Sequence, residues 1–329
     1  MNLTPTEDAN VKNPMDLFQA HSFYGGRPAG KFVSEGSLKP CDSRLKWHVP
    51  GTVANSYGLD RSGTVDYSFN SLGYRSEEYR SDAKFRVCIV GESHAFGTGV
   101  HFEDTFGFNL KVLIAETLNL ELDEVNLINL AIGGSSADYC ARTVFRQLPT
   151  LAADFVVCII PPPDRIEFRQ GEGFNTFGVG SVDVDNLDKL PVPLLGFCEY
   201  YSRLVGGFNQ VKNILLIENF LRSHNIEFVI AVENFPWPGD GVKPLDPFLA
   251  ELDEDRLLRH EFFRQRADFA ADGSHAGPRS HKAFAIQVFH HYGCLLRVKG
   301  MSDIADVIEI KACQLMSEDD DFKFCTMAS

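Results

Sequence analysis

Residues 85–97 read FRVCIVGESHAFG, and this stretch decides the fold. Its first six residues form a short apolar run, which is typical of a strand buried on both faces of a parallel sheet. The run ends at Gly91, and an amphipathic helical pattern follows over residues 105–118. A buried strand followed by a loop and a helix predicts a βα unit.

The same alternation continues along the chain and sets the fold class. Apolar runs predict further strands at residues 125–130, 155–160 and 226–232. Amphipathic patterns predict further helices at residues 138–148, 210–223, 278–292 and 302–316, the first with Asp138 as its N-cap. This order indicates an α/β fold with three α/β/α layers around a parallel sheet. Loops at the carboxyl ends of such strands build the functional site, and they begin here at Gly91, Gly133, Pro161 and Glu233.

The flanking segments differ from this body in composition. Residues 1–64 hold proline, glycine and polar residues without sustained periodicity, so we expect an irregular N-terminal arm. Residues 65–300 form the predicted α/β domain, in which 165–208 is an insertion long enough to act as a lid. Residues 301–329 are expected to form a C-terminal helix and an acidic tail.

Composition excludes several classes of function. The 329 residues carry a net charge of −14, which disfavours binding to nucleic acid. No apolar run approaches the roughly 20 residues of a membrane span, and the N-terminus lacks a signal-peptide pattern, so we expect a cytoplasmic protein that does not bind membranes. The eight cysteines show neither a CxxC pair nor a zinc-ligand spacing, and no nucleotide-binding motif is complete. We therefore expect neither a metal nor an organic cofactor.

Three short motifs carry the chemistry. Ser93 directly follows the first strand, Gly133 and Gly134 follow the second, and Asp272 and His275 precede the last long helix. Each motif alone is weak evidence, because serine in a βα loop commonly caps a helix and polar turns are frequent. Together, at one edge of one sheet, they match the residue types that activate a serine nucleophile and stabilise an oxyanion.

An α/β-hydrolase would have the same order of serine, aspartate and histidine. That fold places its serine in a Gly-x-Ser-x-Gly elbow after several earlier strands. Here position 95 is alanine, and Ser93 follows the first strong strand. These two differences argue against that fold.

The motifs resemble those of the SGNH/GDSL hydrolase family, whose fold is flavodoxin-like. The residues Gly91-Glu92-Ser93 are similar to its Gly-Asp-Ser block, with glutamate in place of aspartate. Residues 129–134 (NLAIGG) resemble its second block, and Asp272-Gly273-Ser274-His275 resembles its Asp-x-x-His block. Residues 70–75 (NSLGYR) are similar to a segment that precedes the catalytic block in many members.

The resemblance implies a role for each matching residue. Ser93 would be the nucleophile, His275 its base and Asp272 the residue that orients the histidine. The backbone N–H groups of Ser93 and Gly134 would bind the oxyanion.

One block departs from the family pattern. The family supplies a further oxyanion donor from an asparagine, but the matching position here is Pro163, which has no donor. Arg165 is the first candidate to replace it and Asn234 the second. The alternative for Arg165 is an ion pair with a nearby acid such as Glu167.

The resemblance implies a serine esterase that cleaves a small acyl ester through an acyl-enzyme on Ser93, with a carbohydrate O-acetyl ester as one candidate substrate. His94, Asn234 and Trp237 are candidate substrate contacts, although a structural role in the interior is the alternative for His94 and Trp237. Because Pro163 removes a donor, a catalytically weak binding module is an alternative function. An O-acyltransferase is another, and the oligomeric state stays open.

Overall fold

The structure is a computed structural model that describes residues 30–33, 65–170, 173–178, 195–198, 201, 203–232, 243–259, 267–270 and 275–318. In the N-terminal arm it describes β1 (Gly30–Val33), which pairs antiparallel with β2 (Asp66–Phe69). The other residues of the predicted arm, and most of the predicted acidic tail, lie outside the described residues.

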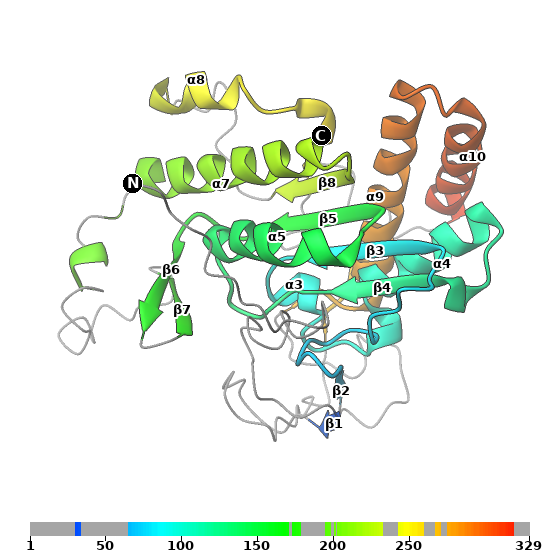
Figure 1. Ribbon diagram of the computed structural model, residues 1–329, viewed down its shortest axis with the longest axis horizontal. Helices are drawn as coiled ribbons and strands as arrows, with labels where there is room; N and C mark the ends of the chain where they lie inside the picture. The colour runs from blue at the N-terminus through cyan, green and yellow to red at the C-terminus, as the bar shows by residue number, and fades with distance from the viewer. Residues whose placement is uncertain are drawn as a thin grey trace, which may run out of the picture.

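A five-stranded parallel sheet forms the centre of the molecule (Figure 1). Its spatial order is β4-β3-β5-β8-β9, and every neighbouring pair is parallel. The strands are β3 (Phe85–Val90), β4 (Val125–Asn129), β5 (Phe155–Ile160), β8 (Glu227–Val232) and β9 (Leu257–Arg259). The predicted α/β fold with a parallel sheet is confirmed, and β9 is a strand that the sequence patterns did not predict.

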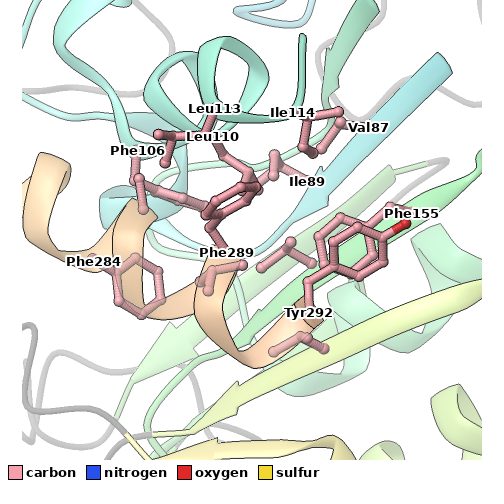
Figure 2. Close-up of a cluster of buried hydrophobic side chains, with 14 of the residues drawn as sticks. Val87, Ile89, Phe106, Leu110, Leu113, Ile114, Phe155, Phe284, Phe289 and Tyr292 are labelled. Carbon is pink, nitrogen blue, oxygen red and sulfur yellow. The ribbon is translucent and has the colours of Figure 1, made fainter. Parts of the chain in front are cut away.

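Helices cover both faces of the sheet because successive strand residues point to opposite sides. Val87 and Ile89 pack into one apolar cluster, while Cys88 and Val90 pack into the other. Figure 2 shows the first cluster, where Phe106 and Leu110 meet the sheet. One face carries α4 (Phe106–Leu118), α9 (Pro278–Val298) and α10 (Ser302–Glu318), and the other carries α5 (Ala137–Leu151), α7 (Arg203–Ser223) and α8 (Asp246–Leu249).

The start of α5 differs from the prediction. Its N-cap is Ser136, whose hydroxyl accepts a hydrogen bond from the Tyr139 N–H, so the prediction of Asp138 as the cap was wrong. Asp138 instead lies in the first turn, and its carboxylate accepts the Glu167 N–H at 3.2 Å and the Asn213 amide at 2.9 Å. The side chain that was expected to cap the helix therefore ties α5 to its neighbours.

The predicted insertion begins with a β-hairpin of β6 (Arg165–Gln170) and β7 (Gly173–Gly178). Arg142 of α5 makes two hydrogen bonds to the Glu167 carboxylate, at 2.6 and 2.9 Å. This partly buried pair joins the hairpin to α5.

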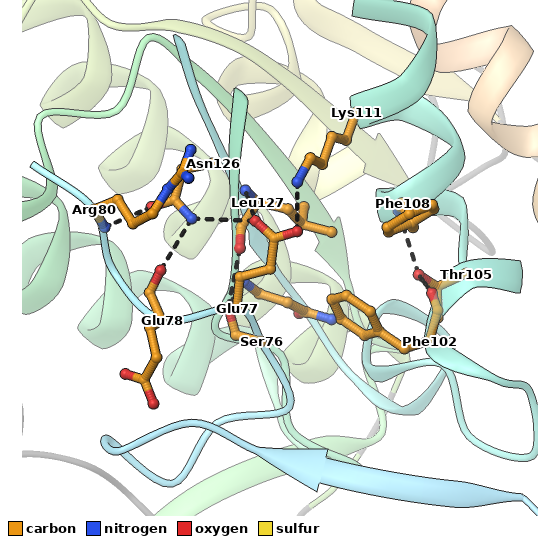
Figure 3. Close-up of polar contacts among 11 residues, drawn as sticks. Ser76, Glu77, Glu78, Arg80, Phe102, Thr105, Phe108, Lys111, Asn126 and Leu127 are labelled. Atoms are coloured by element: carbon orange, nitrogen blue, oxygen red, sulfur yellow. Dashed lines mark hydrogen bonds and ion pairs between the residues drawn. The ribbon is translucent and has the colours of Figure 1, made fainter. Parts of the chain in front are cut away.

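Side chains protect the edge strand β4 (Figure 3). The Ser76 hydroxyl donates to the Leu127 carbonyl and accepts the Asn129 N–H, while the Glu77 carboxylate accepts the Leu127 N–H at 3.0 Å. Lys111 of α4 pairs with the same carboxylate at 2.5 Å. An edge strand with open N–H and C=O groups pairs readily with other chains, and these contacts occupy that edge.

Within the described part of the chain, no helix is long and apolar enough to cross a membrane. The same residues contain no cluster of three or more histidine, cysteine, aspartate or glutamate side chains that could hold a metal ion.

Glu218 of α7 is a buried carboxyl group. It is only 3% exposed, and its Oε1 has no hydrogen-bond partner among the described residues. Burial disfavours the charged form and raises the pKa of Glu218 to about 7. The folded protein therefore keeps this proton at pH values where the unfolded chain has released it, so Glu218 lowers stability as the pH rises from about 4.5 to about 7.

We expect Glu218→Gln to gain stability relative to the natural protein as the pH rises, because glutamine has no charge to bury. Between pH 4 and pH 8 the difference in unfolding free energy should grow by roughly 3 kcal/mol, at about 1.4 kcal/mol per pKa unit. Urea denaturation at both pH values measures it. A difference that stays constant with pH would contradict the prediction.

Candidate active site

Ser93 lies where β3 ends and a single helical turn, α3 (Ser93–Phe96), begins. The turn ends at Gly97, whose φ of +80° is the left-handed conformation that favours glycine. A Cβ at Gly97 would also lie 2.4 Å from the Thr105 Cγ2 atom, so a larger residue would clash as well. Gly97 therefore allows the helical turn that begins at Ser93 to end after Phe96.

The structure brings Ser93 and His275 together. The Nε2 atom of His275 lies 2.9 Å from the Ser93 Oγ atom, although 182 residues separate the two in the chain. His275 precedes α9, and Ser93 follows β3, so both lie beyond the carboxyl edge of the sheet. A hydroxyl in contact with an imidazole nitrogen is the arrangement that can generate an alkoxide nucleophile. Asp272, the predicted third member, lies outside the described residues.

His94 packs against His275. Their ring centroids are 4.7 Å apart at an angle of 52°, and His94 is 9% exposed. This burial suits a side chain that supports the position of His275, and its predicted contact with substrate stays a prediction. Asn234 and Trp237, the other two predicted contacts, lie outside the described residues.

The second motif lies beside Ser93. A Cβ built on Gly133 would stand 4.0 Å from the Ser93 Cβ atom, so the two loops are close neighbours. Gly134 has a φ of +77°, and nothing described lies within 4 Å of where its Cβ would be. The Ser135 hydroxyl donates to the Gly91 carbonyl at 2.9 Å, and the Asn129 amide donates to the Ala95 carbonyl at 3.0 Å. These two bonds join the second motif to the residues that flank Ser93.

Glu92 contacts Ser93, which the sequence analysis did not predict. Its carboxylate is the N-cap of α3 and is only 2% exposed. The Oε1 atom accepts the His94 N–H at 2.9 Å. The Oε2 atom accepts the Ser93 N–H at 2.6 Å and lies 2.5 Å from the Ser93 Oγ atom. The same carboxylate therefore occupies both the amide and the hydroxyl of Ser93.

Arg165 lies at this site and approaches Glu92. Its Nη1 atom lies 3.7 Å from the Glu92 Oε2 atom and donates to the Ser135 carbonyl at 3.4 Å. The alternative of an ion pair with a nearby acid therefore holds for Glu92 and not for Glu167, which pairs with Arg142. Arg165 thus approaches the site as a counter-ion to Glu92, and its predicted role as an oxyanion donor stays a prediction.

Arg75 supports the loop that follows α3. The guanidinium is 1% exposed and donates to three carbonyls: Phe96 at 3.2 Å, Val100 at 2.6 Å, and Gly97. It also lies 4.4 Å from the centre of the Tyr67 ring, within the range of a cation–π contact. Arg75 is the last residue of the segment 70–75. Its hydrogen bonds join that segment to the loop that follows α3.

His281 is part of the same interior. It is fully buried on α9, and its Nδ1 atom accepts the Phe106 N–H at 3.0 Å. Burial lowers the pKa of His281 to about 3, with the nearby positive charge of Arg75 as a second cause. His281 is therefore neutral at ordinary pH and anchors the start of α4 to the helix that follows His275.

No protein-family model matches the chain, and no curated protein matches it. Among solved structures, the chain is similar to the esterase EstA from Pseudoalteromonas sp. at 13% identity and a TM-score of 0.41, covering 64% of this chain and 98% of that one. A family 3 carbohydrate esterase from Clostridium thermocellum is similar at 15% identity and a TM-score of 0.39, covering 65% of this chain and 98% of that one. At these identities and TM-scores, the likeness assigns no activity and no substrate to this chain.

We expect Arg75→Met to destabilise the protein by about 3 kcal/mol or more, because it leaves buried carbonyls without donors at a cost of about 1–3 kcal/mol each. Chemical denaturation at pH 7 measures the loss. Arg86→Met is the control, since Arg86 donates to the carbonyls of Arg80 and Ser81 in a more exposed position. It should cost about 1 kcal/mol or less. Equal losses in the two variants would contradict the special role of Arg75.

Proposed function

We propose that the chain is a serine esterase that cleaves a small acyl ester through an acyl-enzyme on Ser93. The observation that carries the proposal is the 2.9 Å contact between the Ser93 Oγ and His275 Nε2 atoms. The position of this pair beyond the carboxyl edge of the sheet supports the proposal too, because loops at that edge of a parallel sheet commonly form active sites.

The reaction follows the chemistry of an activated serine. His275 Nε2 takes the hydroxyl proton while Oγ attacks the ester carbonyl and forms a tetrahedral oxyanion. The N–H groups of Ser93 and Gly134 are the proposed donors to that oxyanion, and Asp272 is the proposed orienting residue for His275. Collapse of the intermediate breaks the ester C–O bond, and the alcohol leaves with the proton from His275. Water then hydrolyses the acyl-Ser93 ester by the same steps in reverse order.

We propose a small acyl group, with a carbohydrate O-acetyl ester as the first substrate class to test. Ser93 and His275 are only partly exposed, and His94 packs against the histidine ring. A short acyl group suits this enclosed position better than a long one.

A weak enzyme that acts mainly as a binding module is the second candidate, and two observations favour it. Pro163 stands where a third oxyanion donor is expected, and the Glu92 carboxylate already accepts the Ser93 N–H. Loss of one donor lowers kcat by about 10²–10³.

Labelling with a fluorophosphonate probe tests the nucleophile. We expect Ser93→Ala to abolish labelling and His275→Ala to lower its rate by about 10² or more, because the hydroxyl loses its base. His290→Ala is the matched control, since His290 lies on α9 near its far end, and it should label like the natural protein. Labelling of the Ser93→Ala protein at the natural rate would place the nucleophile elsewhere.

Turnover of p-nitrophenyl acetate separates an esterase from a binding module. We expect hydrolysis that disappears in Ser93→Ala, and we expect acetate as the product even when a sugar acceptor is present. Acetylated sugar as the main product would instead indicate an O-acyltransferase. Binding of an O-acetylated sugar without any turnover would favour the binding module.

A further inference from the structure

The Ser93 hydroxyl contacts two groups that can accept a hydrogen bond, but it has only one proton to donate. The Oγ atom lies 2.5 Å from the Glu92 Oε2 atom and 2.9 Å from the His275 Nε2 atom. A carboxylate only accepts, so the short contact with Glu92 uses the serine proton. The contact with His275 is then a hydrogen bond only if Nε2 carries a proton and donates it to Oγ. In that state His275 cannot act as the base for Ser93.

The Ser93 amide is occupied in the same way. Its N–H donates to the Glu92 Oε2 atom at 2.6 Å, so it is not directed at a substrate. A carboxylate at that position also repels the negative charge that a tetrahedral intermediate develops, because both charges are close together in a poorly hydrated site. One side chain therefore occupies the nucleophile and an oxyanion donor together.

We propose that the Glu92 carboxylate holds Ser93 in a resting state and must move off Ser93 before acyl transfer, with Arg165 as the cation that receives it. This inference rests on the esterase function proposed above. When the carboxylate moves, the serine proton becomes available to His275 and the amide becomes available to the ester carbonyl oxygen. Glu92 thereby controls the rate of the reaction without forming a bond to the substrate.

The surroundings of Glu92 provide a place for the carboxylate to go. The Arg165 Nη1 atom lies 3.7 Å from Oε2, too far for a hydrogen bond but close enough for a strong charge interaction. Arg165 begins β6, and the pair of Arg142 with Glu167 fixes that strand against α5. A small rotation of the Glu92 side chain would exchange its contacts with Ser93 for a direct ion pair with Arg165.

The length of the side chain matters. The family that this motif resembles has aspartate at this position, and glutamate is longer by one methylene group. In this chain, the glutamate carboxylate contacts the amide and hydroxyl of the next residue. Shortening the side chain and removing its charge are therefore two independent ways to release Ser93.

The test compares Glu92→Asp, Glu92→Gln and the natural protein in fluorophosphonate labelling and in p-nitrophenyl acetate turnover. We expect both variants to raise the labelling rate and kcat by about tenfold or more, with KM within about threefold, because an oxyanion donor is worth about 10²–10³ in kcat. Glu218→Gln is the matched control, since it removes a buried carboxylate whose contact is the Asp253 N–H. It should leave both rates within about twofold.

Arg165→Ala completes a double-mutant cycle. In the natural background, we expect it to lower the labelling rate by about tenfold, because the carboxylate loses the charge that draws it from Ser93. In the Glu92→Gln background it should change the rate by less than about twofold. An equal loss in both backgrounds would show that Arg165 does not act through Glu92.

A measurement on the natural protein does not depend on any Glu92 variant folding. Nitrogen-15 NMR of the His275 ring reports which nitrogen carries a proton, with His275→Ala for the assignment. We expect a protonated Nε2 in the resting natural protein. A bare Nε2 in the natural protein would overturn the inference.

The outcomes distinguish this inference from the proposed function. Labelling at Ser93 in the natural protein, with no increase in folded Glu92→Asp and Glu92→Gln, would leave the esterase in place and overturn the role of Glu92. No Ser93-dependent labelling or turnover in any of the three proteins would overturn the esterase, and the role of Glu92 with it.

Discussion

The parallel pairing of β3 and β4 continues past the ends of both strands, and the rest of the site depends on it. The Leu130 N–H donates to the Ile89 carbonyl at 2.8 Å, and the Ile132 N–H donates to the Gly91 carbonyl at 3.0 Å. Two loops that would otherwise diverge are therefore held at backbone distance until Gly133 lies beside Ser93. Since a backbone ladder fixes this neighbourhood, the side chains of the site need only adjust locally.

Much of this arrangement is encoded in short, strong patterns. The apolar runs of β3, β5 and β8 predicted buried parallel strands because helices cover the central residues of those strands on both faces. Once parallel strands were predicted, Ser93 and Gly133 had to lie at the same edge of the sheet. The contact between Ser93 and His275 depends on the same topology, because the chain returns to that edge before α9 begins.

Sequence patterns could not predict several other features, for identifiable reasons. The strand β9 has only three residues, too few for any periodicity to be recognised. The helix α7 begins at Arg203, earlier than its apolar pattern suggested, because exposed residues at its start gave no amphipathic signal. The cap at Ser136 and the neighbouring Asp138 are both good N-cap residues, and only the tertiary contacts of Asp138 decide between them. Asp272 lies outside the described residues, so the full triad stays a prediction.

A pairing of Arg165 with an acid was foreseen, but the choice of Glu92 was not, since it depends on side-chain reach rather than on residue type. This pairing also links two departures from the pattern that the motifs resemble. Where an asparagine donor is expected, the chain has Pro163, and Arg165 follows two residues later. Where aspartate is expected, the chain has Glu92, and its longer side chain reaches Ser93. Because Glu92 and Arg165 lie 3.7 Å apart, the charge of each side chain acts on the other. The two departures from the pattern therefore meet at one pair of side chains, so neither substitution should be interpreted alone.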